Sequence, residues 1–250
     1  MRTTVLLFAL ACPAVAQMAG YSSTELEKHT PLNPYPRLAD GRPATPRFWL
    51  EMLRDVSSNE AHEALVEAGY PFQWEGGWQN PHPDKKLIGR AVTVQFMPER
   101  PDVNRIIEAD AAERGDDPHG TKRIIDRLQP GDVAVVDIMG KVKDGQFGGD
   151  NLIFGLFVAS GNGFVVNGSF RDLDGVFPHR VPVFSRGYHP SVRAGAMLTG
   201  VNVPIRIGGV TIMPGDIVLG DRMGVTFIPP HLVQRVVAHV EGDGAAARLE

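Results

Sequence analysis

The chain has 250 residues, a formal net charge of −4 and a single cysteine, Cys12. This length is enough for one domain with a sizeable buried core. The lack of a basic tract argues against a nucleic-acid partner, and one cysteine cannot form an internal disulfide or a multi-cysteine metal site.

The first residues have the pattern of a secretory signal peptide. Arg2 gives a positive start, residues 5–11 are apolar, and Ala14-Val15-Ala16 is a small-x-small cleavage pattern. We therefore expect residues 1–16 to be removed and the protein to be periplasmic or secreted; a frayed apolar N-terminus is the alternative. No later apolar run is long enough to predict a membrane span.

Residues 17–46 are polar and rich in proline, which predicts an extended N-terminal arm lying on the body or on a neighbouring subunit. The remaining residues, 47–250, show no repeat and no linker, and form one predicted catalytic domain. Within it, residues 48–68 have helical spacing, with Ser57-Ser58 expected to cap the second of two helices.

The middle of the chain alternates between strands and helices. Residues 89–96 predict a strand entered from a glycine, and residues 104–112 and 121–128 predict short helices. Residues 133–138 are apolar except for Asp137, as expected for a strand buried on both faces.

A β-α-β unit follows directly. Residues 140–149 are a polar loop ending in two glycines, residues 151–160 are apolar at helical spacing, and residues 164–166 predict a strand. Such a unit is expected to have a right-handed crossover. The segment from Gly168 to Asp172 leaves the end of this second strand.

The last third of the chain is mostly β and ends in an amphipathic helix at residues 231–241. The predicted short strands are residues 181–184, 203–207, 210–212, 217–219 and 225–228. The whole pattern indicates a single domain of the α/β class.

Polar residues gather at one rim of the β-α-β unit. Ligands in α/β folds bind beyond the carboxyl ends of the strands, where helix N-termini present free N–H groups. The helix beginning near Asp150 supplies such a terminus, and Arg171 and Asp172 leave the next strand at the same rim. Asp150 could equally be a helix cap, and Arg171 and Asp172 could be a plain surface ion pair.

Two stretches resemble a known family. Gly148-Gly149-Asp150-Asn151-Leu152, followed by Val166-Asn167-Gly168-Ser169-Phe170-Arg171-Asp172, is similar to the RraA-like group, which includes metal-dependent 4-hydroxy-4-methyl-2-oxoglutarate aldolases. Twenty residues separate Asp150 from Arg171, as in the aldolase form of the motif. The resemblance implies a single-domain α/β/β sandwich of the swivelling phosphohistidine-domain type, assembled as homotrimers or homohexamers.

The resemblance also implies roles for the motif residues. Asp172 would hold Mg²⁺ or Mn²⁺, and Arg171 would bind the carboxylate and keto oxygen of a small 2-oxo acid. Gly149, Asp150, Asn151 and Leu152 would bind this substrate through backbone amides, and Asp150 would also position the water that takes a proton.

The implied activity is a divalent-metal lyase that cleaves 4-hydroxy-4-methyl-2-oxoglutarate-type acids to pyruvate and decarboxylates oxaloacetate. A non-catalytic binding or regulatory protein of the same family is the alternative. The chain departs from the family at Gly175 and Met223, where many members have acidic residues.

Overall fold

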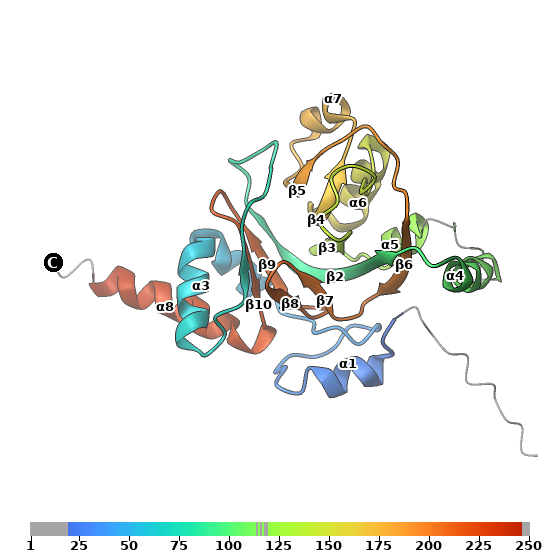
Figure 1. The fold of residues 1–250 in the computed structure, drawn as a ribbon. Coiled ribbons are helices and arrows are strands. Elements are labelled where there is room, and N and C mark those ends of the chain that lie inside the picture. The colour runs from blue at the N-terminus through green and yellow to red at the C-terminus, as the bar shows by residue number, and fades with distance from the viewer. Residues whose placement is uncertain (1–19, 114, 116, 118–119, 247–250) are drawn as a thin grey trace, which may run out of the picture.

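The structure is a computed structural model that describes residues 20–113, 115, 117 and 120–246, so the predicted signal peptide, residues 1–16, lies outside the described residues. Its largest element is an eight-stranded mixed sheet in the order β1-β10-β9-β2-β3-β4-β5, with β6 also paired to β2 (Figure 1). Its strands are β1 (Trp74–Glu75), β2 (Leu87–Pro98), β3 (Asp132–Asp137), β4 (Phe164–Phe170), β5 (Val183–Tyr188), β6 (Ala196–Val201), β9 (Ile217–Gly220) and β10 (Val225–Ile228). A separate hairpin pairs β7 (Ile205–Ile207) with β8 (Val210–Ile212).

The helices are distributed along the whole chain. They are α1 (Ser23–His29), α2 (Arg47–Met52), α3 (Ser58–Glu67), α4 (Pro101–Glu113), α5 (Thr121–Ile125), α6 (Asp150–Ser160), α7 (Leu173–Val176) and α8 (Val233–Ala246). Short 3₁₀ turns cover Leu53–Asp55, Phe177–His179 and Pro230–Leu232. Within the described residues, no helix is both long and apolar enough to cross a membrane.

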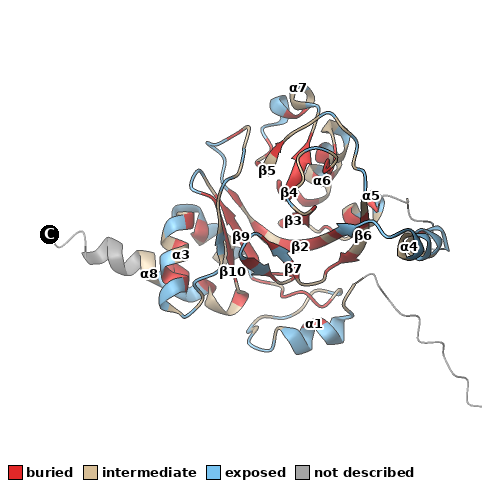
Figure 2. Cartoon of the chain, viewed as in Figure 1, coloured by how far each residue is buried: buried red, intermediate tan, exposed pale blue. Residues whose placement is uncertain are grey.

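Three apolar clusters hold these elements in layers. α6 packs its buried Ile153 and Leu156 on one face of β3 and β4, while the β7–β8 hairpin covers the opposite face. α3 and α8 cover β9 and β10 (Figure 2). The parallel strands β2 to β5 are therefore buried on both faces, as the continuous apolar run in β3 indicates. This arrangement confirms the predicted α/β class.

Most predicted elements are present, with local differences. Ser57 caps α3 in a capping box with Glu60, which confirms the predicted cap. The strand predicted at residues 164–166 continues to Phe170, so Gly168 to Phe170 are strand residues rather than a loop. The strand β6 and the helix α1 have no counterpart among the predicted elements.

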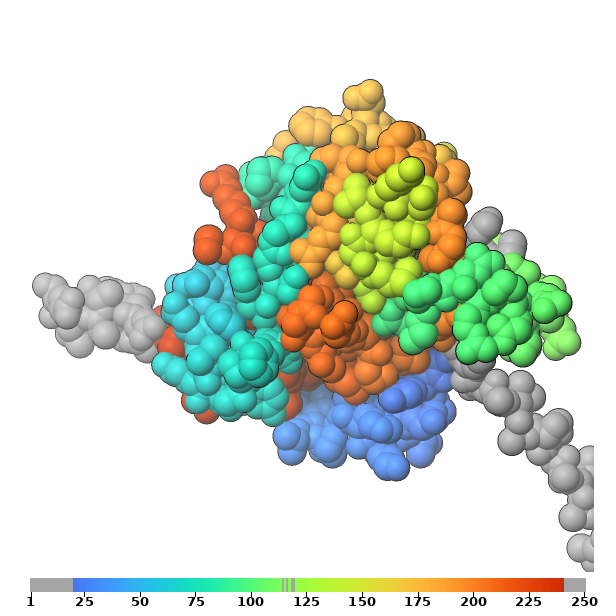
Figure 3. Space-filling view, in the orientation of Figure 1, coloured from blue at the N-terminus to red at the C-terminus, as the bar shows by residue number. Residues whose placement is uncertain are grey.

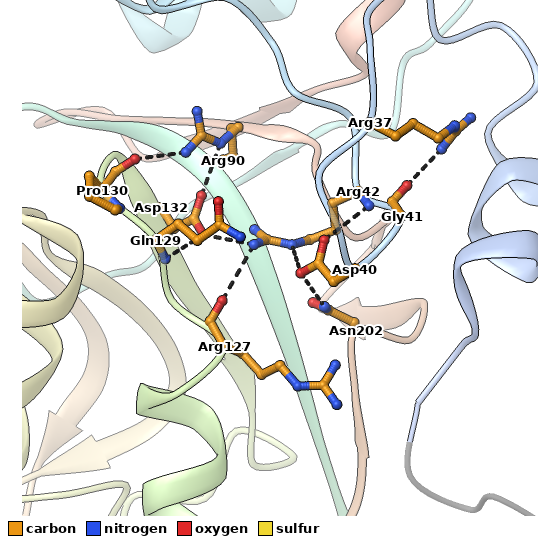
Figure 4. Close-up of polar contacts among 10 residues, drawn as sticks. All are labelled: Arg37, Asp40, Gly41, Arg42, Arg90, Arg127, Gln129, Pro130, Asp132 and Asn202. Carbon is orange, nitrogen blue, oxygen red and sulfur yellow. Dashed lines mark hydrogen bonds and ion pairs between the residues drawn. The ribbon is translucent and has the colours of Figure 1, made fainter.

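The arm is not extended throughout, because residues 23–29 form α1. After this helix it is fastened to the sheet through Arg42, whose side chain is fully buried (Figure 4). The guanidinium of Arg42 lies 2.7 Å from Asp40 and 2.8 Å from Asp132, and Asp132 also pairs with Arg90 at 2.9 Å. Burial alone would lower the pKa of Arg42, but the two carboxylates outweigh burial and raise it.

Candidate active site at the end of β4

The loop between β3 and α6 runs beside β4 and is joined to the end of this strand by backbone hydrogen bonds. Ser169 donates its N–H to the carbonyl of Gly145 at 2.9 Å and accepts the N–H of Phe147 at 2.8 Å. The N–H of Arg171 then donates to the carbonyl of Gly148 at 3.2 Å. This ladder brings Gly148 and Gly149 beside Arg171 and its neighbour Asp172, although some twenty residues separate them in the sequence.

The carboxylate of Asp172 lies directly against the backbone of Gly149. A Cβ atom at position 149 would overlap Asp172 Oδ2, so a larger residue would fit there only by displacing this carboxylate or the backbone. Asp172 adopts the left-handed conformation, with φ of 61° and ψ of 44°, and its carbonyl accepts the N–H groups of Gly175 and Val176. The chain thereby turns sharply from β4 into α7 at the residue predicted to hold the metal.

Arg171 places its guanidinium beside the same carboxylate. Its Nε lies 3.3 Å from Asp172 Oδ2, and both side chains are close to half exposed, at 41% and 44%. This Nε is buried but makes no aligned hydrogen bond, and within the described residues the side chain donates none elsewhere. Arg171 and Asp172 thus form an ion pair through Nε, while the two Nη groups have no hydrogen-bond partner among the described residues and can bind an incoming anion.

Asp150 is not the N-cap of α6. Gly149 occupies that position without a side-chain cap, and Asp150 is the first helical residue, with its Oδ1 accepting the N–H of Asn151 at 2.7 Å. The other oxygen faces α7, because a Cβ at Gly175 would lie 2.5 Å from Asp150 Oδ2. The small residue at position 175 thus leaves the room that the Asp150 carboxylate fills.

The other two predicted substrate-binding residues also lie in the first turn of α6. Asn151 is exposed, and Leu152 is half-buried with its side chain over Gly148, where a Cβ would come within 2.4 Å of it. The structure therefore brings Gly149, Asp150, Arg171 and Asp172 together, with Asn151 and Leu152 on the adjoining helical turn.

A polar chain behind this rim was not anticipated as functional. Asn167 donates to Asp137 Oδ1 at 2.7 Å, and Gln95 donates to Asp137 Oδ2 at 2.7 Å. Arg186 Nε donates to Asn167 Oδ1 at 2.8 Å, and its Nη2 pairs with Glu75 at 2.5 Å. The only sequence signal was Asp137, which interrupts an apolar strand; the other members of this chain lie on four other strands, β1, β2, β4 and β5.

The site has one carboxylate suited to a metal ion, that of Asp172, and few other potential metal ligands near it. Among the described residues, no group of three or more His, Cys, Asp or Glu side chains could together hold a metal. Asp172 offers a half-exposed carboxylate, a hard oxygen donor of the type that Mg²⁺ accepts while keeping several waters. The residues present therefore fit a largely hydrated Mg²⁺ and do not fit a site that needs several protein ligands.

Comparison with known protein sequences gives a consistent set of relatives. "Protein DlpA" of Legionella pneumophila is 31% identical over 192 residues, covering 75% of this chain and 28% of its own length. A "Putative 4-hydroxy-4-methyl-2-oxoglutarate aldolase" of Halalkalibacterium halodurans is 39% identical over 101 residues, covering 40% of this chain and 47% of its own length. The chain thus spans less than half the length of these two relatives.

Solved structures extend the similarity to nearly the whole fold. Streptomyces coelicolor RraAS2, described as an unusual member of the RNase ES inhibitor RraA protein family, superposes with a TM-score of 0.71 and 27% identity. The match covers 86% of this chain and 98% of that one. An uncharacterized protein from Pseudomonas syringae gives a TM-score of 0.66 and 25% identity, covering 81% of this chain and 90% of that one.

The family model described as RraA-like, Aldolase/RraA, matches residues 60–227. This range contains the β-α-β unit, the rim with Arg171 and Asp172, and every strand of the main sheet except the last residue of β10. The chain belongs to the RraA-like, Aldolase/RraA family.

Proposed function

We propose that this protein is a divalent-metal-dependent lyase that releases pyruvate from 4-hydroxy-4-methyl-2-oxoglutarate-type acids and decarboxylates oxaloacetate. The observation that carries the proposal is the contact of the Asp172 carboxylate with Gly149, beside the Arg171 guanidinium, which donates no aligned hydrogen bond to any described residue. The relatives named as aldolases support the reaction class.

The substrate is bound by fixed cationic and N–H groups. Arg171 takes the 1-carboxylate and the 2-oxo oxygen, because a planar guanidinium can donate to both from one side. The first turn of α6, from Gly149 to Leu152, offers backbone N–H groups and the positive end of the helix dipole to the same anion. The 2-oxo group is thereby placed beside Asp172.

Both reactions break the bond between C3 and C4 and leave its electron pair delocalised toward the 2-oxo oxygen. A divalent cation held by Asp172 supplies Lewis-acid stabilisation of that charge. Arg171 adds a fixed positive charge that needs no reorganisation during the reaction. In the aldol cleavage, Asp150 positions the water that accepts the 4-hydroxyl proton, and C3 is protonated afterwards to give pyruvate.

The test is pyruvate release from oxaloacetate and from 4-hydroxy-4-methyl-2-oxoglutarate with Mg²⁺. We expect Arg171→Ala and Asp172→Ala each to lower kcat/KM by about a hundredfold or more, as loss of a charged transition-state contact does. Asp174→Asn is the matched control, because Asp174 is exposed on α7 only two residues from Asp172. Chelation of the metal should abolish the activity of the wild type.

Equal rates in the wild type and the two alanine variants would refute the site assignment. A wild type that releases no pyruvate from either acid would favour the second candidate, a non-catalytic binding protein. The similarity to RraAS2, whose description names an RNase inhibitor family, is the observation behind that candidate.

The assembly and the location of the protein are part of the same proposal. We propose a homotrimer or homohexamer, exported after removal of residues 1–16, with residues 17–46 as an arm ahead of the catalytic domain. Light scattering of the purified protein measures the oligomeric state. A mature N-terminus at Gln17 in an exporting host would establish export and cleavage. A monomer, or an intact Met1 in the exported fraction, would contradict them.

A further inference from the structure

A cavity of about 440 Å³ lies away from Arg171. It is enclosed by the loop that follows β1, the turn between β9 and β10, and the ring of Phe184 in β5. Phe184 pairs with Val165 near the start of β4, whereas Arg171 follows the end of that strand. Figure 3 shows the β1–β2 loop in teal at the upper left of the molecule, close to the red-orange β9–β10 turn.

Asn80 presents an unpaired donor to this cavity. Asn80 accepts the N–H of His82 with its Oδ1 at 2.8 Å, which fixes the amide orientation and leaves Nδ2 as the free end. That Nδ2 is buried and has no hydrogen-bond partner among the described residues. An unpaired buried amide donor costs about 1–3 kcal/mol, so an acceptor supplied by a ligand would be stabilised there.

Arg222 adds a positive charge at the mouth of the cavity. Its Nε donates to the carbonyl of Pro83 at 3.1 Å, and no carboxylate pairs with it in the part of the chain that is described. The neighbouring carboxylate of Asp221 is already occupied, because it accepts the N–H and hydroxyl of Ser58 and the N–H of Met223. The cavity thus offers an amide donor and a cation, while the oxygens of the Asp221 carboxylate already accept hydrogen bonds from the protein.

The remaining walls are apolar. Trp78 lines the cavity. Its Nε1 donates to the backbone carbonyl of Glu75, and the Arg186 guanidinium lies 3.9 Å from its ring centroid, so the indole N–H is already paired and its ring offers apolar surface. Phe184 forms a buried wall, and Met223 is 60% exposed at the rim. Aromatic and thioether walls favour a flat apolar body over a strongly hydrated one.

We propose that this cavity is a binding site for a small carboxylate with a flat apolar body, held by Asn80 Nδ2 and the Arg222 guanidinium. The site is independent of the proposed lyase reaction, because none of the residues at the end of β4 lines it. The carboxylate supplies the acceptor that Asn80 lacks and the counter-charge that Arg222 lacks, while its apolar body packs between Trp78 and Met223.

The test is calorimetric titration of the full chain with benzoate, and with benzamide as the uncharged isostere. We expect benzoate to bind and benzamide to bind at least tenfold more weakly, since the ion pair and charged hydrogen bonds are lost. Arg222→Gln and Asn80→Asp should each weaken benzoate binding by about tenfold or more. Aspartate at position 80 keeps the acceptor for His82 but repels the ligand.

Two further variants identify where the probe binds. Arg206→Gln removes an exposed arginine on the β7–β8 hairpin and should leave the affinity for benzoate unchanged. Arg171→Ala should also leave it unchanged; loss of binding in this variant would place the probe at the end of β4 and overturn the proposal. No binding to the wild type, or equal binding to the wild type and Arg222→Gln, would overturn it as well.

Discussion

Asp172 combines an uncommon backbone conformation with an unusual side-chain environment. A left-handed conformation costs most residues about 1 kcal/mol or more, and aspartate is one of the few that tolerate it. In exchange, the chain turns into α7 while the carboxylate stays against Gly149. The residue types at this rim could be singled out from the sequence, but the conformation that joins them could not.

Asp150 shows why a local sequence pattern leaves the role of a single residue open. An aspartate at the start of a helix is equally typical of a cap and of a ligand-binding group. The choice depends on a one-residue shift of the helix start, which local sequence does not determine. In the structure Gly149 is the N-cap, so Asp150 directs one carboxylate oxygen toward α7 instead.

Asp216 gives a prediction at this scale. Burial raises its pKa to about 7, with the N–H of Met213 as a partly compensating donor. In the unfolded chain it titrates near its usual value of about 4, so between pH 4 and 7 the folded state holds the proton that the unfolded state loses. Asp216 therefore lowers the free energy of unfolding increasingly as the pH rises from 4 to 7, and this effect stays constant at higher pH.

Replacing Asp216 with asparagine removes this titration. The free energy of unfolding of Asp216→Asn, relative to the wild type, should rise by roughly 2–4 kcal/mol between pH 4 and pH 8. Urea unfolding of both proteins at several pH values measures the difference. A constant difference across this range would mean that Asp216 is ionised in the folded protein at pH 4 and above.

At the scale of elements, the β-α-β unit was predictable because β3, α6 and β4 are each specified by their own residues. The strand β6, which the sequence did not predict, illustrates the opposite case. Its six residues include a threonine and a glycine, and it is held by pairing with β2 across a register shift at Gln95 and Phe96. Such a strand depends on a distant partner more than on local propensity.

The junction between the β3–α6 loop and α6 can be tested with Gly149→Ala. The added methyl would overlap the Asp172 carboxylate, so it must displace either the helix start or the proposed metal ligand. We expect pyruvate release to fall by about a hundredfold, as displacement of a reacting group by about 1 Å does.

Gly155→Ala is the matched control on the same helix. A Cβ there would lie 3.3 Å from the end of the Ile125 side chain, which can move, and alanine favours a helix by about 1 kcal/mol over glycine. Activity should stay at the wild-type level in this variant. Similar activity in Gly149→Ala would show that the close approach of Asp172 is not required.

At the scale of the whole molecule, the arm is joined to the body by charges that no local pattern reveals. Arg42 and Asp132 are ninety residues apart in the sequence and meet in the fully buried interior. We expect Arg42→Ala to lower the free energy of unfolding by about 3–5 kcal/mol, because it leaves a buried carboxylate short of a partner.

Urea unfolding of Arg42→Ala measures this effect. Arg47→Ala is the control, since Arg47 pairs with Glu51 at 2.8 Å but is 86% exposed, and such surface pairs contribute about 1 kcal/mol or less. If both variants lost the same stability, the Arg42 pairs would contribute no more than a surface contact.

The pairing of β2 sets the order in which the chain can fold. This strand bonds to β3, which follows it within 34 residues, but also to β6 and to β9, whose first residue is Ile217. The central strand therefore keeps an open edge until the C-terminal part of the chain has been made. Sheets that depend on such distant pairings form slowly, and until then the exposed edge of β2 is open to pairing with other chains.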